Sequence, residues 1–275
     1  MRKNTIAALL LGATFAFIVY ACKKDGATQQ KDPEPVPQDV IAKIKALGFS
    51  SSGVRAAEGG WLVEGDILLT AENLSEASTS ANLRIAETEQ YRTNNLVKSL
   101  PRQITVKVMD LGPAFVSGAD LAIARYNAQN LQLTFRRITS GKADITIKGF
   151  YQGPSGGFIT LGSAGFPTRN GNPYGTISMN THEQAYGANP NVDYVGSVIQ
   201  HEMGHCIGFR HTDYMDRAFS CGASGAGNEG ASNVGAVHIP GTPTGPDAAS
   251  WMLACSNGGN RTFNANDIVA LNYLY

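Results

Sequence analysis

Apolar residues recur along the chain at two different spacings, and each spacing predicts one kind of element. Residues 103–109 and 131–138 alternate apolar with polar side chains, which is typical of strands that bury one face. Residues 118–129, between them, have the apolar spacing of a helix. The alternating residues 143–147 predict a further strand.

The pattern continues to the C-terminus with two more strands and two more helices. Residues 156–164 and 175–180 are predicted strands. A helix then begins after Asn191 or Asp193, either of which can cap it. Its predicted buried stripe consists of Tyr194, Val195, Val198 and Ile199. The last helix is capped by Asn264, and its apolar stripe consists of Ile268, Leu271 and Leu274.

The region before these elements has a weaker pattern and is predicted to be a separate unit. Residues 40–47 form a short amphipathic helix, residues 61–69 are strand-like, and residues 72–92 are polar with helical tendency. We therefore divide the body of the chain into an N-terminal unit or pro-segment, 40–99, and a main domain, 100–275.

The first residues have the form of an export signal. Arg2 and Lys3 precede an apolar run, 5–20, that is too short to span a membrane comfortably. Residues 19–22 resemble the lipobox of bacterial lipoprotein signals, and the resemblance implies that Cys22 is the lipidated first residue of the mature protein.

We accordingly assign residues 1–21 to a lipoprotein signal peptide and the proline-punctuated residues 22–39 to a flexible tether. The expected location is outside the cytoplasm, with a lipid anchor in a membrane on its outer-membrane, periplasmic or surface side. An ordinary secretory signal and an uncleaved anchor are the alternatives, and the first of these predicts a secreted protein.

Composition excludes some classes of partner. With 275 residues, 43% of them hydrophobic, the chain is long enough to bury a core. Its formal net charge is zero, so no basic face favours nucleic acid as a partner. We expect a monomer whose partners are protein or peptide substrates and, through the lipid, a membrane.

Three of the five histidines fall within eleven residues and suggest a metal site. On a helix, His201 and His205 leave the same face one turn apart, so both imidazoles can bind one cation. Gly208 can end that helix in a left-handed conformation and turn His211 back toward the other two. Three imidazoles and one open position describe a catalytic zinc site, and Glu202 is placed to reach the metal's water.

The full spacing HExxHxxGxxH resembles the metzincin clan of zinc endopeptidases, and HEMGHCIGFRHTD is most similar to bacterial HEIGH-type metallopeptidases. Residues 122–147 also resemble the first helix and the next two strands of matrixins. The resemblance implies an α/β (α+β) zincin fold, with a twisted mixed sheet of five strands, two long helices and an irregular C-terminal subdomain that ends in a helix. It also implies a zinc endopeptidase with Glu202 as general base.

The same resemblance implies roles for residues outside the motif. Met252 is the expected methionine of the turn beneath the three histidines, and Ala254 stands where astacins place a zinc-binding tyrosine. The strand 156–164 should lie at the sheet edge and pair with substrate, and its substrate-contacting residues are expected to be Gly157, Leu161 and Ala164.

Residues 63–67, VEGDI, resemble the FxGDI element of astacin propeptides, in which an aspartate binds the zinc and keeps the precursor inactive. By this resemblance Asp66 is a zinc ligand of the zymogen, because a carboxylate is a good oxygen ligand for zinc. The alternative is an acidic strand end followed by a tight turn at Gly65.

The remaining cysteines and histidines leave alternatives open. Cys206, Cys221 and Cys255 allow three single disulfides, and we favour Cys221 with Cys255, which ties the loop after His211 to the segment near Met252. We interpret His182 and His238 as non-ligands. A structural calcium ion is left open, as are the cleavage preference and the processing site.

Two other functions compete with the endopeptidase. One is a surface binding lipoprotein that keeps zinc for structure, which predicts a closed fourth position even after processing. The other is a zinc amidase that acts on non-peptide substrates with the same metal.

Overall fold

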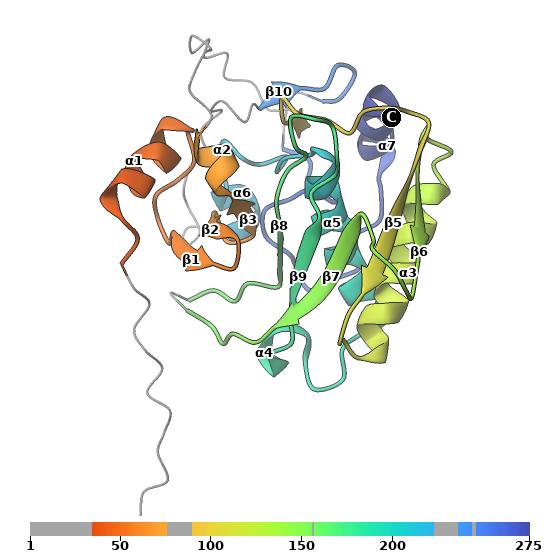
Figure 1. Cartoon of the computed structure of the whole chain (residues 1–275), viewed down its shortest axis with the longest axis horizontal. Helices are drawn as coiled ribbons and strands as arrows, with labels where there is room; N and C mark the ends of the chain where they lie inside the picture. The colour runs from red at the N-terminus through yellow and green to blue at the C-terminus, as the bar shows by residue number, and fades with distance from the viewer. Residues whose placement is uncertain (1–34, 76–89, 156, 223–235, 244–245) are drawn as a thin grey trace, which may run out of the picture. The chain divides into compact units, whose positions relative to one another are not determined.

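The main feature of the computed structural model is a mixed sheet of eight strands among the described residues, which are 35–75, 90–155, 157–222, 236–243 and 246–275 (Figure 1). All of these residues belong to one compact unit, 33–275. The proposed signal peptide and Cys22 lie outside the described residues. In the described ranges, no helix has the length and apolar character needed to cross a membrane.

The strands follow the order β1-β2-β3-β8-β9-β7-β5-β6. Their bounds are Arg55–Ala57 for β1, Gly60–Val63 for β2, Ile67–Leu69 for β3, Arg102–Val108 for β5, Leu133–Arg137 for β6, Ile145–Phe150 for β7, Gly162–Ala164 for β8 and Thr176–Asn180 for β9. Strands β9, β7, β5 and β6 run parallel, and β8 is antiparallel to β9.

The predicted mixed α/β fold is confirmed, but the prediction of five strands is wrong. The main domain does supply five strands, β5 to β9, and the N-terminal region adds β1, β2 and β3 to the same sheet through the parallel pairing of β3 with β8. A strand with an open edge presents unpaired N–H and C=O groups, and a neighbouring hairpin satisfies them.

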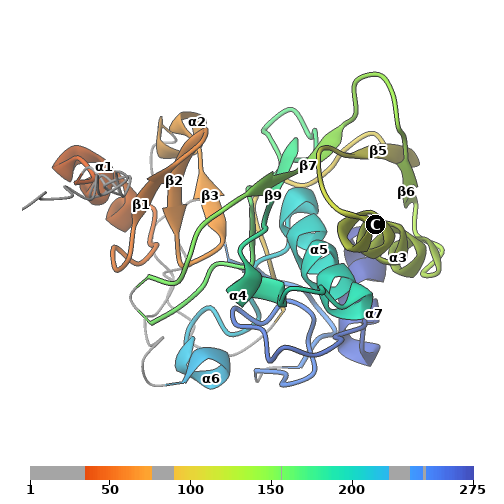
Figure 2. The same ribbon diagram turned by 90° about the horizontal axis from the view of Figure 1, so that it is seen from below.

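Two long helices cover one face of the sheet, as Figure 2 shows. They are α3, Pro113–Asn127, and α5, Val192–Ile207. The helices cross closely because Gly118 has no side chain; a Cβ there would lie 2.9 Å from Val195. Helix α3 begins five positions before the predicted start, at a proline, which suits the first turn of a helix.

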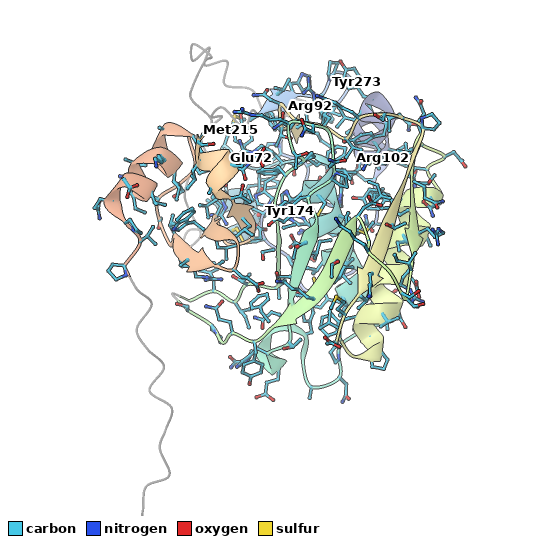
Figure 3. All side chains as sticks on the ribbon, viewed as in Figure 1. Glu72, Arg92, Arg102, Tyr174, Met215 and Tyr273 are labelled. Atoms are coloured by element: carbon cyan, nitrogen blue, oxygen red, sulfur yellow. A yellow bond between two sulfur atoms is a disulfide. The ribbon has the colours of Figure 1, made fainter. Side chains whose placement is uncertain are left out.

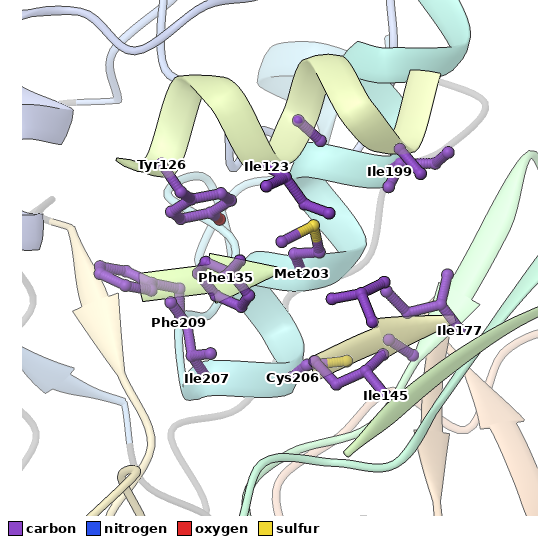
Figure 4. Close-up of a cluster of buried hydrophobic side chains, with 14 of the residues drawn as sticks. Ile123, Tyr126, Phe135, Ile145, Ile177, Ile199, Met203, Cys206, Ile207 and Phe209 are labelled. Atoms are coloured by element: carbon purple, nitrogen blue, oxygen red, sulfur yellow. The ribbon is translucent and has the colours of Figure 1, made fainter. Parts of the chain in front are cut away.

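The core lies between these helices and the sheet, where side chains fill the space (Figures 3 and 4). Ile145 and Ile177 of the sheet are fully buried against Met203 and Cys206 of α5. From α3, the hydroxyl of Tyr126 donates to the carbonyl of Gln200 at 2.9 Å. The C-terminal half of α5 is therefore fixed on both sides.

The C-terminal region is irregular and ends in α7, Ala265–Leu274, as predicted. Asn264 and Asp267 form a capping box at its start. The short elements are α4, Glu183–Tyr186; α6, Ala218–Cys221; and β10, Val237–His238, which pairs with β4, Tyr91–Arg92. Strand β4 corrects the prediction of helical tendency up to residue 92; before it, only α2, Ala71–Ser75, is helical in the described part of 72–92.

The N-terminal region contains α1, Gln38–Ala46, and a small hydrophobic cluster of its own. The predicted strand 61–69 is interrupted: β2 and β3 form a hairpin, and its turn contains Glu64 at φ 58° and Gly65 at φ 102°. Positive φ at two successive residues reverses the chain sharply. This hairpin turn presents Asp66 to the rest of the molecule.

Candidate metal centre

Helix α5 places the first two histidines on one face. It is capped by Asn191, whose side chain accepts from the backbone N–H of Tyr194 at 3.0 Å. It ends at Gly208, which adopts φ 112°, a left-handed conformation that strains any residue with a Cβ. His201 and His205 therefore project together, and the turn after Gly208 brings His211 beside them.

Four side chains converge at this place. The ligand atoms of Asp66, His201, His205 and His211 all lie within 4.8 Å of one another. The Nε2 atoms of His205 and His211 are 3.2 Å apart, and Asp66 Oδ2 lies 3.2 Å from His211 Nε2 and 3.5 Å from His201 Nε2. Ligands about 2.0–2.1 Å from zinc in a tetrahedron lie roughly 3.3–3.4 Å apart, so the cluster fits that ion.

Backbone carbonyls fix the tautomers of two ligands. His201 Nδ1 lies 2.9 Å from the carbonyl oxygen of Trp251, and His205 Nδ1 lies 2.9 Å from that of Phe209. A carbonyl only accepts, so each Nδ1 carries the proton and each Nε2 keeps its lone pair for the metal. Burial lowers the pKa of His205 well below its usual value, which keeps the imidazole neutral, as metal binding requires.

Met252, the expected methionine of the turn, packs against the helix that carries His201 and His205. Its sulfur packs on Gly204 of α5, where a Cβ would be only 2.6 Å away. The carbonyl of Met252 accepts from the N–H of Thr212 at 2.9 Å, which ties this turn to the residue after His211. Met252 is fully buried.

Glu202 is buried beside the cluster and directly faces β8. A Cβ on Gly162 would lie 2.7 Å from its Oε1, so only glycine leaves room for the carboxylate. In the described residues its Oε2 has no hydrogen-bond partner, nor does Asp66 Oδ1. Burial, followed by the charge of Asp66, raises the pKa of Glu202 well above its usual value. Such orphaned buried oxygens fit a site that holds a cation and water.

Asp66 reaches the histidines from the hairpin turn. Burial raises the pKa of Asp66, but the charge of His211 and close contact with the imidazoles of His201 and His211 hold it well below the usual range. The carboxylate stands where a fourth ligand of a tetrahedral metal would lie. The two interpretations made from the sequence, a tight turn at Gly65 and a carboxylate beside the histidines, are therefore compatible.

The expected substrate strand differs from its predicted form. Strand β8 contains only Gly162–Ala164, and it lies inside the sheet because β3 pairs with it, with Ala164 N–H donating to Asp66 carbonyl at 3.0 Å. Leu161 precedes the strand, and Gly157 sits in a turn at φ 84°. Gly156 lies outside the described residues. The edge is occupied because the N-terminal hairpin is covalently tethered next to it.

Other candidates lie away from the cluster. His182 caps α4, and His238, which lies in β10, contacts Thr242. Cys206 is free and buried in the core of Figure 4. A disulfide joins Cys221 to Cys255, the pair favoured from sequence. Asp213 accepts from the N–H of Ala254 at 2.9 Å, which links the residues just after His211 to the same segment.

Sequence reasoning missed the glycines that admit these side chains. Gly204, the glycine of HEMGH, admits Met252, and Gly162 admits Glu202. Their signal was a glycine within a helix and within a strand, where glycine weakens the element and marks a close approach. The two orienting carbonyls leave no trace in the sequence, because any residue supplies one.

Comparison with known proteins gives a family for most of the chain. Residues 61–275 match the family of dual-action HEIGH metallopeptidases. No curated protein matches the chain. Two solved structures of myroilysin resemble it at a TM-score of 0.40: one with 15% identity over 66% of this chain and 82% of that one, the other with 14% identity over 86% and 95%.

Proposed function

The chain belongs to the dual-action HEIGH metallopeptidase family, and on that premise we propose that it is a zinc-dependent endopeptidase with Glu202 as its general base. The three histidines would hold the ion. A bound zinc ion would supply a Lewis acid that lowers the pKa of its water toward about 7 and polarises the scissile carbonyl. Protein and peptide substrates follow from the peptidase family.

Glu202 performs the proton transfers in this proposal. Its carboxylate takes a proton from the attacking water, whose oxygen bonds to the carbonyl carbon. It then gives that proton to the amine nitrogen as the C–N bond breaks. Burial keeps bulk water from competing for the carboxylate, and His201 and His205 hold fixed positions through their bonds to Trp251 and Phe209.

The observation that carries the proposal is the convergence of three imidazoles at metal-ligand spacing next to a buried glutamate. The test compares wild type with Glu202→Ala after removal of the N-terminal segment. Both should bind one zinc per chain, and the variant should cleave a denatured protein roughly 10²–10⁴-fold more slowly. Equal rates of cleavage by both proteins would show that Glu202 is not the general base. A wild type that binds zinc but cleaves no protein would contradict the proposed endopeptidase function.

We further propose that the full-length chain is a latent precursor in which Asp66 is the fourth zinc ligand. Asp66 lies 3.2–3.5 Å from two ligand nitrogens, and the pairing of β3 with β8 covers the strand expected to bind substrate. A carboxylate at the fourth position excludes the reactive water. The same closed position also favours the alternative of a non-catalytic zinc protein.

Asp66→Ala in the full-length chain separates these two possibilities. A precursor predicts zinc-dependent cleavage by the intact variant, or earlier processing, with wild type inactive until its N-terminal segment is cut. The non-catalytic alternative predicts that neither protein cleaves in either form. Activity of Asp66→Ala equal to that of intact wild type would count against Asp66 as the latency ligand.

Export and lipid anchoring remain a proposal, supported by residues 1–22 and by the disulfide between Cys221 and Cys255, since disulfides persist in oxidising compartments. Cys22→Ala should abolish metabolic labelling by palmitate and release the protein from membranes. Labelling that persists in the variant would exclude Cys22 as the lipid site.

A further inference from the structure

A buried ion pair links the N-terminal hairpin to the residue before the third histidine. Glu64 Oε2 lies 4.0 Å from a guanidinium nitrogen of Arg210, and neither side chain is exposed. Burial makes such a pair costly to break on one side, because the remaining charge stays in a low-dielectric place. The carboxylate belongs to the hairpin and the guanidinium to the segment between Gly208 and His211.

Aromatic rings from the main domain and from the N-terminal unit both lie near the guanidinium. Its carbon lies 5.4 Å from the ring centre of Tyr214 and 4.8 Å from that of Phe49. The N–H of Arg210 donates to the carbonyl of Tyr91 at 2.9 Å, so the backbone here is fixed by β4. Departure of residues 38–75 removes both Phe49 and Glu64 and opens this face, while β4 stays in place.

A second cation contacts the same hairpin turn. The guanidinium of Arg217 donates a hydrogen bond to the backbone carbonyl of Glu64. This contact is to the main chain, which any peptide in an extended or turned conformation also offers. Arg210 therefore meets the side chain and Arg217 meets the backbone of one residue that lies two positions from Asp66.

The hairpin turn thus occupies the metal centre. Asp66 provides an oxygen at the metal position, and Glu64 places a carboxylate beside Arg210. Gly65 carbonyl and Asp66 carbonyl accept from Thr160 and Ala164 on the β8 side. The same short segment therefore provides the fourth potential metal ligand, bonds to β8 and places a carboxylate beside Arg210.

We propose that Arg210 is a specificity-determining residue, which binds an acidic side chain of the substrate once the N-terminal segment has left. The inference rests on the proposed peptidase function and names its substrate class: peptides with Glu or Asp close to the scissile bond. A charge-assisted bond to a carboxylate is lost when that residue is an amide, so the preference should be about tenfold or more in kcat/KM.

The cleavage test uses zinc-loaded protein whose N-terminal segment has been removed by limited proteolysis, with the cut verified by mass. Peptide pairs that differ only in Glu against Gln near the cleaved bond are compared. Wild type should favour the Glu peptide by about tenfold, Arg210→Lys should keep part of the preference, and Arg210→Gln should lose it. Arg136→Gln, on β6 and paired with Gln103, is the matched control and should keep the full preference.

The inference would be overturned if wild type cleaved the Glu and Gln peptides with equal kcat/KM, or if Arg210→Gln did not change the ratio of the two values. Either result would leave the proposed peptidase function standing. If Arg210→Gln does not fold, Arg217→Gln is used instead, because Arg217 is partly exposed. It should raise KM for both peptides of a pair and leave the ratio of their kcat/KM values unchanged. An altered ratio in that variant would assign the preference to Arg217 and overturn the role of Arg210.

A binding test reads the same contact without cleavage. A labelled peptide of residues 60–69 is titrated onto processed Glu202→Ala protein, and its Glu64→Gln form should bind about tenfold more weakly. In an Arg210→Gln background the two peptides should bind equally, whereas an Asp66→Ala peptide should be weakened in both backgrounds. Equal binding of the unsubstituted and Glu64→Gln peptides to protein that retains Arg210 would overturn the inference even if every peptide is cleaved.

Discussion

The main domain and the N-terminal unit are held together by cores of very different extent. The core around α5 takes buried side chains from α3, α5, α7 and all five strands β5 to β9. The cluster of the N-terminal unit takes them from α1, α2, β2 and β3, with Phe166 as its contribution from the main domain. His201 and His205 therefore project from a helix of the large core, whereas Asp66 lies in the turn of the hairpin that contributes Val63 and Ile67 to the small one.

This difference explains how the histidines can be held rigidly by one core while a segment held by the other core covers them. His201 and His205 are oriented by carbonyls of the main domain, and none of the buried side chains in the large core comes from residues 38–75, so departure of those residues need not disturb them. The small cluster contains fewer buried apolar side chains than the large one, so their burial contributes less free energy. Stability of the site and stability of its closed state should respond to different substitutions.

The largest expected effects on stability come from two matched substitutions, each of which creates a cavity in one of the two cores. Ile145→Ala in β7 and Ile44→Ala in α1 both truncate a fully buried isoleucine. The first should lower the free energy of unfolding of the main domain by about 2–5 kcal/mol. The second should leave α5 protected and expose only residues 38–75 to hydrogen exchange. Loss of protection in α5 on Ile44→Ala would break the comparison, since the two cores would then unfold as one.

A pH dependence tests the polar support of the main domain. Burial raises the pKa of Asp267 from 3.8 to about 6, so its proton is held more tightly in the folded state. The stabilisation is complete below pH 3.8 and is lost as pH rises through about 6, on the order of 3 kcal/mol. The difference in unfolding free energy between wild type and Asp267→Asn, measured without zinc from pH 4 to 7, should shift accordingly. A constant difference would contradict the raised pKa.

A close contact within the large core is expected to matter next. Gly204→Ala places a Cβ 2.6 Å from the sulfur of Met252 and 3.1 Å from Trp251 Nε1. The strain should cost about 1–3 kcal/mol and weaken zinc binding, because Trp251 also orients His201. Gly175→Ala is the control: its Cβ would meet only the carbonyl oxygen of Asp144, at 3.5 Å, which is an ordinary contact, so thermal stability and zinc content should stay nearly unchanged.

Helix capping gives a smaller effect and distinguishes the two regions. Asn191 caps α5 through its side chain, whereas Pro37 before α1 makes no such bond. Asn191→Ala should lower the stability of the main domain by about 1 kcal/mol in urea unfolding. The exposed pair Asp39 and Lys43 in α1 is the smallest case, and Asp39→Asn should produce no measurable change.

The fold and the clustering of the three histidines followed from short-range patterns in the sequence. The spacing of His201, His205 and His211 depends only on helix geometry and a left-handed glycine, so it was readable without tertiary structure. The two long helices and the terminal helix were also found, with shifts of a few residues at their ends.

Contacts between distant segments could not be read in this way. The pairing of Ile67 with Ala164 depends on an open strand edge meeting a tethered hairpin, and neither sequence alone specifies its partner. The proximity of Glu64 to Arg210 depends on a turn with two positive φ angles, one of them at a glutamate. Such a conformation is rare for glutamate and gives no advance signal.

The docking of β3 on β8 also bears on solubility. An exposed strand edge is a template for pairing with other chains, and natural proteins cover such edges or keep them short. In the full-length chain the outermost strand on this side is β1, which has only three residues, so little backbone is offered to a neighbour. Loss of the N-terminal unit bares β8. An exposed edge also favours self-association, so protein cut after residue 75 as proposed should aggregate at a lower concentration than the full-length chain.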